Sequence, residues 1–164
     1  MISKPYSTDF TLEGKLAIVT GAGSGIGYST AKLFSEKGAT VCLLDRNLDS
    51  VKAASTEIPN SHPYFVDVAN HDQVFEVVDQ ITKELGNIDV LVHCAGVGDI
   101  DWAENFEQKT WEKVISINLS GSFFMSQAVG KKMIAAGNGG KIICMASQAG
   151  IVAIDKHVAY SASK

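Results

Sequence analysis

The chain has 164 residues, of which 46% are apolar, and this suits one domain, 1–164, with its own core and no Pro-rich or Ser-rich linker. Its formal net charge of −4, without any run of basic residues, argues against a nucleic-acid partner or an acidic membrane surface. Since the sequence also lacks a signal-peptide core at Met1–Tyr6 and any apolar run of about 18 residues, we expect a soluble cytoplasmic protein with a small-molecule partner.

Short apolar runs alternate along the chain with longer segments of helical period. The runs are rich in Val, Ile, Leu and Cys, which is typical of strands buried on both faces of a parallel sheet. The expected strands are 16–20, 40–44, 64–66, 90–94 and 142–145. The expected helices are 26–37, 49–57 and 71–85, and a longer helical segment covers 110–136.

This succession of strands and helices predicts an α/β fold of the Rossmann type, a doubly wound parallel sheet flanked by helices. In such sheets ligands bind beyond the carboxyl ends of the strands. The segments that follow the predicted strands are therefore the first places to look for a site.

A glycine-rich loop follows the first predicted strand and precedes the first helix. It reads Thr20-Gly21-Ala22-Gly23-Ser24-Gly25-Ile26-Gly27, which fits TGxxxGxG rather than GxGxxG because Ile26 occupies the third glycine position. Glycines let the backbone turn sharply and approach a pyrophosphate, and the helix N-terminus offers free N–H groups and a favourable dipole. A glycine loop alone could be only a tight turn. Placed between a strand and a helix, this one predicts a dinucleotide site that includes Gly21, Gly23, Ser24, Gly25, Ile26 and Gly27.

Carboxylates close the second and third strands. Asp45 follows Gly27 by 18 residues and can accept hydrogen bonds from the ribose hydroxyls of an adenosine. Because Asp45 would repel a 2′-phosphate, it favours NAD over NADP, although the adjacent Arg46 could turn toward such a phosphate. The alternative is that Asp45 and Arg46 form an ordinary exposed turn. Asp67 and Val68 close the third strand and are expected to contact adenine.

Small residues close the fourth strand, where Cys94, Ala95 and Gly96 would let a cofactor lie across the sheet edge. The three cysteines, Cys42, Cys94 and Cys144, lie in apolar runs without CxxC or Cys/His spacing. We therefore interpret them as small core residues and expect no metal site.

The last five residues, Tyr160-Ser161-Ala162-Ser163-Lys164, place a phenol and an amine one helical turn apart on the same face. A phenol is a poor base at neutral pH, but an ammonium within about 4–6 Å favours the phenolate. Tyr160 and Lys164 are thus a candidate proton-transfer pair. Tyr and Lys at this spacing also occur on many solvated helix faces, so the pair depends on the rest of the sequence for support.

The motifs occur in an order that resembles the short-chain dehydrogenase/reductase family, from about residue 12 to the end. They are the glycine loop, Asp45, Asp67, Cys94-Ala95-Gly96, Asn118, Ser147, and Tyr160 with Lys164. One motif departs slightly, since the family usually has Asn-Asn-Ala-Gly where this sequence has His93-Cys94-Ala95-Gly96. The resemblance implies an oxidoreductase that transfers a hydride between NAD and a secondary alcohol or ketone.

The resemblance also implies a role for each catalytic residue. Tyr160 would exchange the proton of the substrate oxygen, and Lys164 would favour the phenolate and bind the nicotinamide ribose. Ser147 would hold the substrate oxygen near the phenol. Asn118 would help to hold a water that links Lys164 to solvent. Asn118 lies inside the long helical segment, where Asn can perturb the backbone hydrogen bonds.

The stretches 94–102 and 145–164 look most like the glycerol-type and threitol-type polyol dehydrogenases of the family, which implies a small polyol substrate. A 3-oxoacyl-thioester reductase is the alternative within the family, although most of those use NADPH and Asp45 argues against it. A non-catalytic NAD-binding or regulatory module is the alternative outside it.

Family members usually continue beyond the Tyr-Lys motif. We therefore expect the C-terminal part of the fold to be missing and the fifth strand to be an exposed edge. The resemblance further implies homo-oligomers, dimers or tetramers, in the full-length form, that form through the segment 110–136 and a partner helix expected to be missing here.

Overall fold

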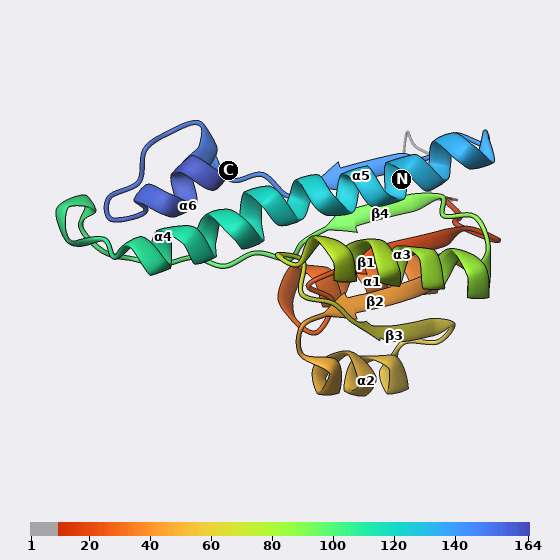
Figure 1. Cartoon of the computed structure of the whole chain (residues 1–164). Helices are drawn as coiled ribbons and strands as arrows, with labels where there is room; N and C mark the ends of the chain where they lie inside the picture. Colours follow the sequence, from red (N-terminus) through yellow and green to blue (C-terminus); the bar gives the residue numbers. More distant parts are fainter. Residues whose placement is uncertain (1–9) are drawn as a thin grey trace, which may run out of the picture.

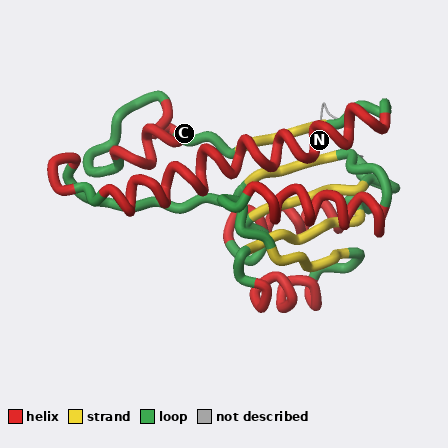
Figure 2. The backbone as a smooth tube through the Cα atoms, viewed as in Figure 1, coloured by secondary structure: helices red, strands yellow, loops and turns green. Residues whose placement is uncertain are grey.

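The computed structural model describes residues 10–164. The stretch Met1–Tyr6, where no signal peptide is predicted, lies outside the described residues. Five parallel strands form one sheet in the order β3-β2-β1-β4-β5 (Figure 1, Figure 2). The strands are β1 (Leu16–Thr20), β2 (Thr40–Asp45), β3 (Ser61–Phe65), β4 (Val90–His93) and β5 (Lys141–Cys144). The chain starts in the middle of the sheet, builds one side and then the other, which confirms the predicted doubly wound topology.

Helices cover both faces of this sheet. On one face lie α1 (Gly25–Glu36) and α2 (Leu48–Glu57), and on the other lie α3 (His71–Leu85) and α5 (Gly121–Ala136). Because both faces are covered, all five residues of β1 are buried, as the unbroken apolar run in the sequence predicts. Burying each Leu or Ile side chain stabilises the fold by about 1.5–3 kcal/mol.

Two further helices lie beyond the carboxyl ends of the strands. They are α4 (Gln108–Ile115) and α6 (Val158–Ser163), which pack against each other (Figure 1). Two short 3₁₀ turns, η1 (Ala103–Asn105) and η3 (Gln148–Gly150), lie in the loops there. The predicted long helical segment consists of α4, a π-helical turn η2 (Ser116–Ser120) and α5 in unbroken succession. Asn118 is the middle residue of that π-helical turn, so the helical ladder does change where the sequence indicates.

The third strand begins earlier than the sequence predicts, at Ser61 rather than at Tyr64. β3 is an edge strand, paired only with β2 in the described residues, and most of its residues are only partly buried. Pro63 lies inside it, and the missing N–H of a proline is tolerated at an edge. The apolar run in the sequence therefore marks only the end of this strand.

The prediction that all three cysteines are core residues is wrong for Cys144. Cys42 is buried and Cys94 is half-buried, but Cys144 is exposed. All four residues of β5 are exposed, since in the described residues β5 pairs only with β4 and forms the second edge of the sheet. An apolar strand can thus be exposed when the described chain covers it only in part, here through α5.

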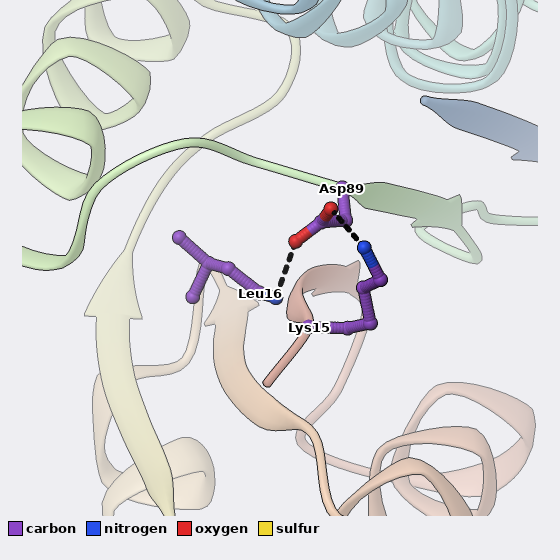
Figure 3. A network of polar contacts seen from close by, with 3 residues as sticks. All are labelled: Lys15, Leu16 and Asp89. Atoms are coloured by element: carbon purple, nitrogen blue, oxygen red, sulfur yellow. Dashed lines mark hydrogen bonds and ion pairs between the residues drawn. The ribbon is translucent and has the colours of Figure 1, made fainter. Parts of the chain in front are cut away.

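Asp89 ties three strands together at the amino edge of the sheet. Its Oδ1 accepts a hydrogen bond from Lys15 Nζ and its Oδ2 accepts one from the N–H of Leu16, both at 2.9 Å (Figure 3). The backbone of Asp89 also bonds Leu16 and Lys141, which begin β1 and β5. Partial burial acts to raise the pKa of Asp89, but the hydrogen bonds from Lys15 and Leu16 outweigh it, so the pKa lies below its usual value. These bonds all lie at the amino edge of the sheet, opposite the carboxyl edge where a site is expected.

Within residues 10–164, no helix has the length and apolar character needed to cross a bilayer. In the same residues, no three His, Cys, Asp or Glu side chains are grouped so that they could hold a metal ion.

Candidate active site

A cavity of about 290 Å³ opens at the carboxyl edge of the sheet, between the segments that follow β1, β2, β3 and β4. Most of the predicted cofactor residues line it: Gly21, Ser24, Gly25, Ile26, Gly27, Asp45, Asp67, Val68, Cys94, Ala95 and Gly96. Gly23, Tyr160 and Lys164 are not among its lining residues. Leu44, Arg46, Val66, Val97 and Ile117 also line it, and of these the sequence analysis singles out only Arg46.

The N-terminus of α1 faces this cavity with its amides uncapped. Ser24 is the N-cap residue, but within residues 10–164 its side chain makes no capping hydrogen bond, and the first turn holds no acidic residue. The next two helices differ, because Asn47 caps α2, Asn70 caps α3, and each first turn contains an Asp. An uncapped helix N-terminus beside a cavity offers free N–H groups and a positive dipole end to an anion.

Glycines at positions 21, 23 and 27 allow close contacts between the loop after β1 and the segments around it. Gly21 has φ +63°, and a Cβ placed on it would lie 2.9 Å from the backbone nitrogen of Ala95. A Cβ on Gly27 would overlap the carbonyl oxygen of Gly21, and one on Gly23 would overlap the hydroxyl of Ser50. The loop after β1 therefore needs glycine at these positions to pack against α1, α2 and the loop after β4.

The Asp45 carboxylate lies at the end of β2, half-buried on the cavity wall. Its Oδ2 accepts a hydrogen bond from the N–H of Gly23 at 3.2 Å, and its Oδ1 accepts one from the N–H of Asn47 at 2.9 Å. These bonds fix the carboxylate, and each oxygen keeps a further lone pair. The exposed Arg46 lines the same cavity, so a cationic group is also within the site.

Asp67 and Val68 form the cavity wall beyond β3. Asp67 Oδ1 accepts a hydrogen bond from the N–H of Ala69 at 3.0 Å, and the N–H of Asp67 donates to Gln73 Oε1 at 3.2 Å. Val68 is buried, and a Cβ on Gly121 would lie 2.9 Å from its Cγ2. The first residue of α5 thus packs directly on this wall.

Thr20 and His93 fix the backbone after β4. Thr20 Oγ1 accepts hydrogen bonds from the N–H groups of Cys94 and Ala95, both at 3.1 Å, so its single proton is donated to His93 Nδ1 at 2.9 Å. This network assigns the proton of the neutral imidazole to Nε2, which is buried and has no partner in the described residues. Burial, helped by the charge of Lys164, lowers the pKa of His93 to about 4.

Asn118 joins the π-helical turn to the loop after β4. Only 2% of the residue is exposed, its Oδ1 accepts from the N–H of Val97, and its Nδ2 donates to the carbonyl of Val97, both at 2.8 Å. Nδ2 also donates to Ser163 Oγ at 2.9 Å. The side chain of Asn118 is therefore fully occupied in holding Val97 and α6.

Tyr160 and Lys164 lie on and directly after α6, beside that same loop. Lys164 Nζ donates to the carbonyl of Met145 at 3.0 Å and lies 5.6 Å from the centroid of the Tyr160 ring. A Cβ placed on Gly96 would lie 3.3 Å from Asn118 Oδ1 and 3.6 Å from Lys164 Nζ. A Cβ on Gly98 would lie 3.9 Å from the Tyr160 ring. Lys164 and Asn118 thus both lie close to Gly96, a residue of the cavity wall.

Ser147 follows β5 and is the N-cap residue of η3. Its Oγ accepts from the N–H of Ala149 at 3.2 Å, and within residues 10–164 it makes no hydrogen bond to Tyr160 or Lys164. The turn it caps packs against the end of α6, because a Cβ on Gly150 would overlap the backbone of Lys164. The structure therefore brings the turn that Ser147 caps next to Lys164, without a hydrogen bond between Ser147 and the Tyr-Lys pair in the described residues.

Sequence reasoning missed Ser163, which connects Asn118 to α6. Its position three residues after Tyr160 places it one turn along the helix, but no local pattern distinguishes it from Ser161. Its partner is 45 residues away in the sequence. Only the folded structure could identify it.

Comparison with known proteins gives a consistent result. Residues 15–164 match the short chain dehydrogenase family. The chain is 47% identical to an NAD-dependent glycerol dehydrogenase of Listeria innocua over 100% of this chain and 65% of the relative. It is 46% identical to a D-threitol dehydrogenase of Mycolicibacterium smegmatis over 95% of this chain and 61% of the relative. The chain thus spans less than two thirds of the length of these two relatives.

The fold also matches solved structures. A short-chain type dehydrogenase/reductase from Mycobacterium marinum superposes with a TM-score of 0.89 at 34% identity. The match covers 94% of this chain and 63% of the other.

Proposed function

This chain belongs to the short-chain dehydrogenase family, and we propose that it is an NAD-dependent oxidoreductase acting on a secondary alcohol or its ketone. The proposal assigns proton transfer to Tyr160, with Lys164, Ser147 and Asn118 in support. The observation that carries it is that Lys164 Nζ and Asn118 Oδ1 both lie close to Gly96, because Gly96 is part of the cavity wall and Tyr160 lies one helical turn before Lys164.

The cavity suits a dinucleotide. The uncapped amides at the start of α1 would hold the pyrophosphate, and the glycines below them leave no side chain in its way. Asp45 would accept the ribose hydroxyls with its free lone pairs and repel a 2′-phosphate, which favours NAD. Asp67 and Val68 would line the adenine side, and Cys94, Ala95 and Gly96 the side toward Lys164.

When bound, NAD would supply the hydride acceptor. Tyr160 would take the proton of the substrate hydroxyl as the phenolate and return it in the reverse direction. The ammonium of Lys164, held by the Met145 carbonyl and 5.6 Å from the centroid of the Tyr160 ring, would bond the nicotinamide ribose. Ser147 would hold the substrate oxygen, and this requires its hydroxyl to turn from the amide of Ala149 toward the substrate.

A small polyol is the proposed substrate class. Support comes from the names of two relatives at 46–47% identity, a glycerol dehydrogenase and a D-threitol dehydrogenase.

We further propose that the protein forms a homo-oligomer through α4 and α5. Four large apolar side chains on the continuous helical segment of α4, η2 and α5 are exposed: Trp111, Leu119, Phe123 and Ile134. Burying them against a second copy would remove that apolar surface from water. Sedimentation velocity of the intact protein, compared with the Phe123→Asp variant, tests this proposal. A monomer in both would contradict it.

A panel of substrates and cofactors tests the proposed reaction. We expect the intact protein to produce NADH from NAD with glycerol, threitol or a related polyol, and to use NADP at least tenfold less well. NADPH-dependent reduction of a 3-oxoacyl thioester in place of polyol oxidation would favour the other family activity. NAD binding without turnover of any alcohol or ketone would favour a non-catalytic binding module.

A further inference from the structure

Ser163 lies at the junction between α6 and the π-helical turn. The residue is 6% exposed, its hydroxyl donates to the carbonyl oxygen of Tyr160 at 2.8 Å, and it accepts from Asn118 Nδ2 at 2.9 Å. Asn118 in turn bonds both backbone groups of Val97, the residue after Gly96. One chain of buried hydrogen bonds therefore runs from the cavity wall to the backbone of Tyr160.

The direction of these bonds fixes the orientation of Asn118. A serine hydroxyl has one proton, and here that proton goes to the carbonyl of Tyr160, so Ser163 can only accept from Asn118. The NH₂ group of Asn118 must then face Ser163, and its oxygen must face the N–H of Val97. Both protons of Nδ2 are used, so the carboxamide has one stable orientation.

We propose that Ser163 is a positioning residue for the Tyr160–Lys164 pair. It acts through Asn118 by holding the end of α6 in register with the Gly96–Val97 backbone, and Lys164 Nζ lies close to Gly96. The inference rests on the proposed function, because it concerns the alignment of the proton-transfer pair with the bound cofactor. Misplacing reacting groups by about 1 Å can cost about a hundredfold in rate.

Ser161 provides a matched control on the same helix. Its Oγ is also buried, but it has no hydrogen-bond partner in the described residues. Ser161→Ala and Ser163→Ala thus remove the same atom from the same helix. Only Ser163→Ala removes a hydroxyl that links two elements of the site.

Steady-state kinetics of the intact protein is the first test. We expect Ser163→Ala to lower kcat by about 10-fold to 100-fold, with the Kd for NAD and the KM for the alcohol changed less than about threefold. Ser163→Thr, which keeps the hydroxyl, should restore kcat to within about threefold, and Ser161→Ala should stay within about twofold.

A second readout does not depend on activity. In ¹⁵N spectra, the side-chain NH₂ of Asn118, assigned by its loss in Asn118→Asp, should exchange slowly with solvent. Ser163→Ala should speed exchange of that NH₂ at least about tenfold, because one of its protons loses its acceptor. Ser161→Ala should leave it unchanged.

The outcomes separate this inference from the proposed function. A wild type that neither binds NAD nor turns over an alcohol contradicts the proposed function. An active wild type in which Ser163→Ala matches Ser161→Ala in kcat and in Asn118 exchange overturns the positioning role. If Ser163→Ala does not fold, Ser163→Cys tests the positioning role in its place. A thiol is similar in size to a hydroxyl but forms only weak hydrogen bonds. Ser163→Cys should lose activity where Ser163→Thr does not, and equal activity of the two overturns the role.

Discussion

The carboxamide of Asn118 pairs with both backbone groups of Val97, with each hydrogen bond 2.8 Å long. A side chain on a regular helix rarely mimics a strand neighbour in this way. Here the π-helical turn Ser116–Ser120 changes the helical ladder at Asn118 and directs its side chain inward. In the loop after β4, Val97 is therefore held by a residue from a helix, whereas Cys94 and Ala95 are held by Thr20 of β1.

Asn118→Ala should consequently destabilise the protein. The change removes three hydrogen bonds and leaves buried partners unsatisfied, which we expect to lower the free energy of unfolding by about 2–4 kcal/mol. Urea unfolding measures the difference. Asn87→Ala removes the same atoms from an exposed loop and should change stability by less than about 0.5 kcal/mol. Equal effects of the two substitutions would contradict the structural role.

Gly27→Ala should reverse the usual effect of alanine in a helix. At an ordinary helical position alanine is about 1 kcal/mol more favourable than glycine. On Gly27 the added Cβ would overlap the carbonyl oxygen of Gly21, so we expect destabilisation by about 1–3 kcal/mol and at least tenfold weaker NAD binding. Thermal unfolding and an NAD titration measure the two effects.

Gly130 on α5 is the control for this substitution. A Cβ there would meet only Ile142 Cδ1, at an ordinary contact distance of 3.7 Å. Gly130→Ala should therefore stabilise the protein by up to about 1 kcal/mol. Stabilisation by both substitutions would show that the glycine loop is not closely packed.

Asp45→Asn should weaken the discrimination against NADP. The amide keeps an oxygen that can accept from Gly23 or Asn47, but it loses the charge that would repel a 2′-phosphate, and Arg46 lines the same cavity. We expect the ratio of the NADP and NAD affinities to rise at least about tenfold, or about 1.4 kcal/mol. Isothermal titration calorimetry measures both affinities. Asp49→Asn removes the same charge from the first turn of α2 and should leave the ratio unchanged.

His93 should make the protein less stable in acid. Its pKa is about 4 in the folded protein, because of burial and then Lys164, against about 6.5 in the unfolded chain. Between these values the unfolded chain binds more protons, so the free energy of unfolding falls as the pH drops from 6.5 toward 4. The shift corresponds to roughly 3 kcal/mol.

Urea unfolding of wild type and His93→Asn at pH 7 and at pH 4.5 isolates this contribution. His93→Asn should lose less stability between the two pH values than the wild type does, since Asn does not titrate. His62→Asn, at a partly exposed position, should follow the wild type. A wild type and a His93→Asn variant with the same pH dependence would show that His93 is not held neutral by the fold.

The sheet and the glycine loop could be predicted because each depends on a local pattern. The unbroken apolar run of β1 requires cover on both faces, and the loop from Gly21 to Gly27 lies between a strand and a helix. The start of β3 could not be predicted in this way, since Ser61 and His62 are polar and their pairing with β2 is set by the sheet. The exposure of Cys144 likewise depends on what covers β5.

The same distinction between local patterns and long-range contacts applies to the candidate site. Each of Asn118, Tyr160 and Lys164 could be identified from a motif, but their connection could not. Ser163 bonds a residue 45 positions away, and Lys164 lies against Gly96 through contacts between four separate segments. Such contacts depend on the packing of α6 on α4 and η2, which leaves no periodic signal in the sequence.

Tyr160→Phe tests the central claim most directly, because it removes the one oxygen assigned to proton transfer and leaves the ring beside Gly98. The measurement is NADH formation with a polyol substrate, paired with an NAD titration of the same sample. We expect turnover to fall at least about a hundredfold while the Kd for NAD stays within about threefold. Turnover within about twofold of wild type, at unchanged NAD affinity, would contradict the assignment of Tyr160 as the acid/base residue.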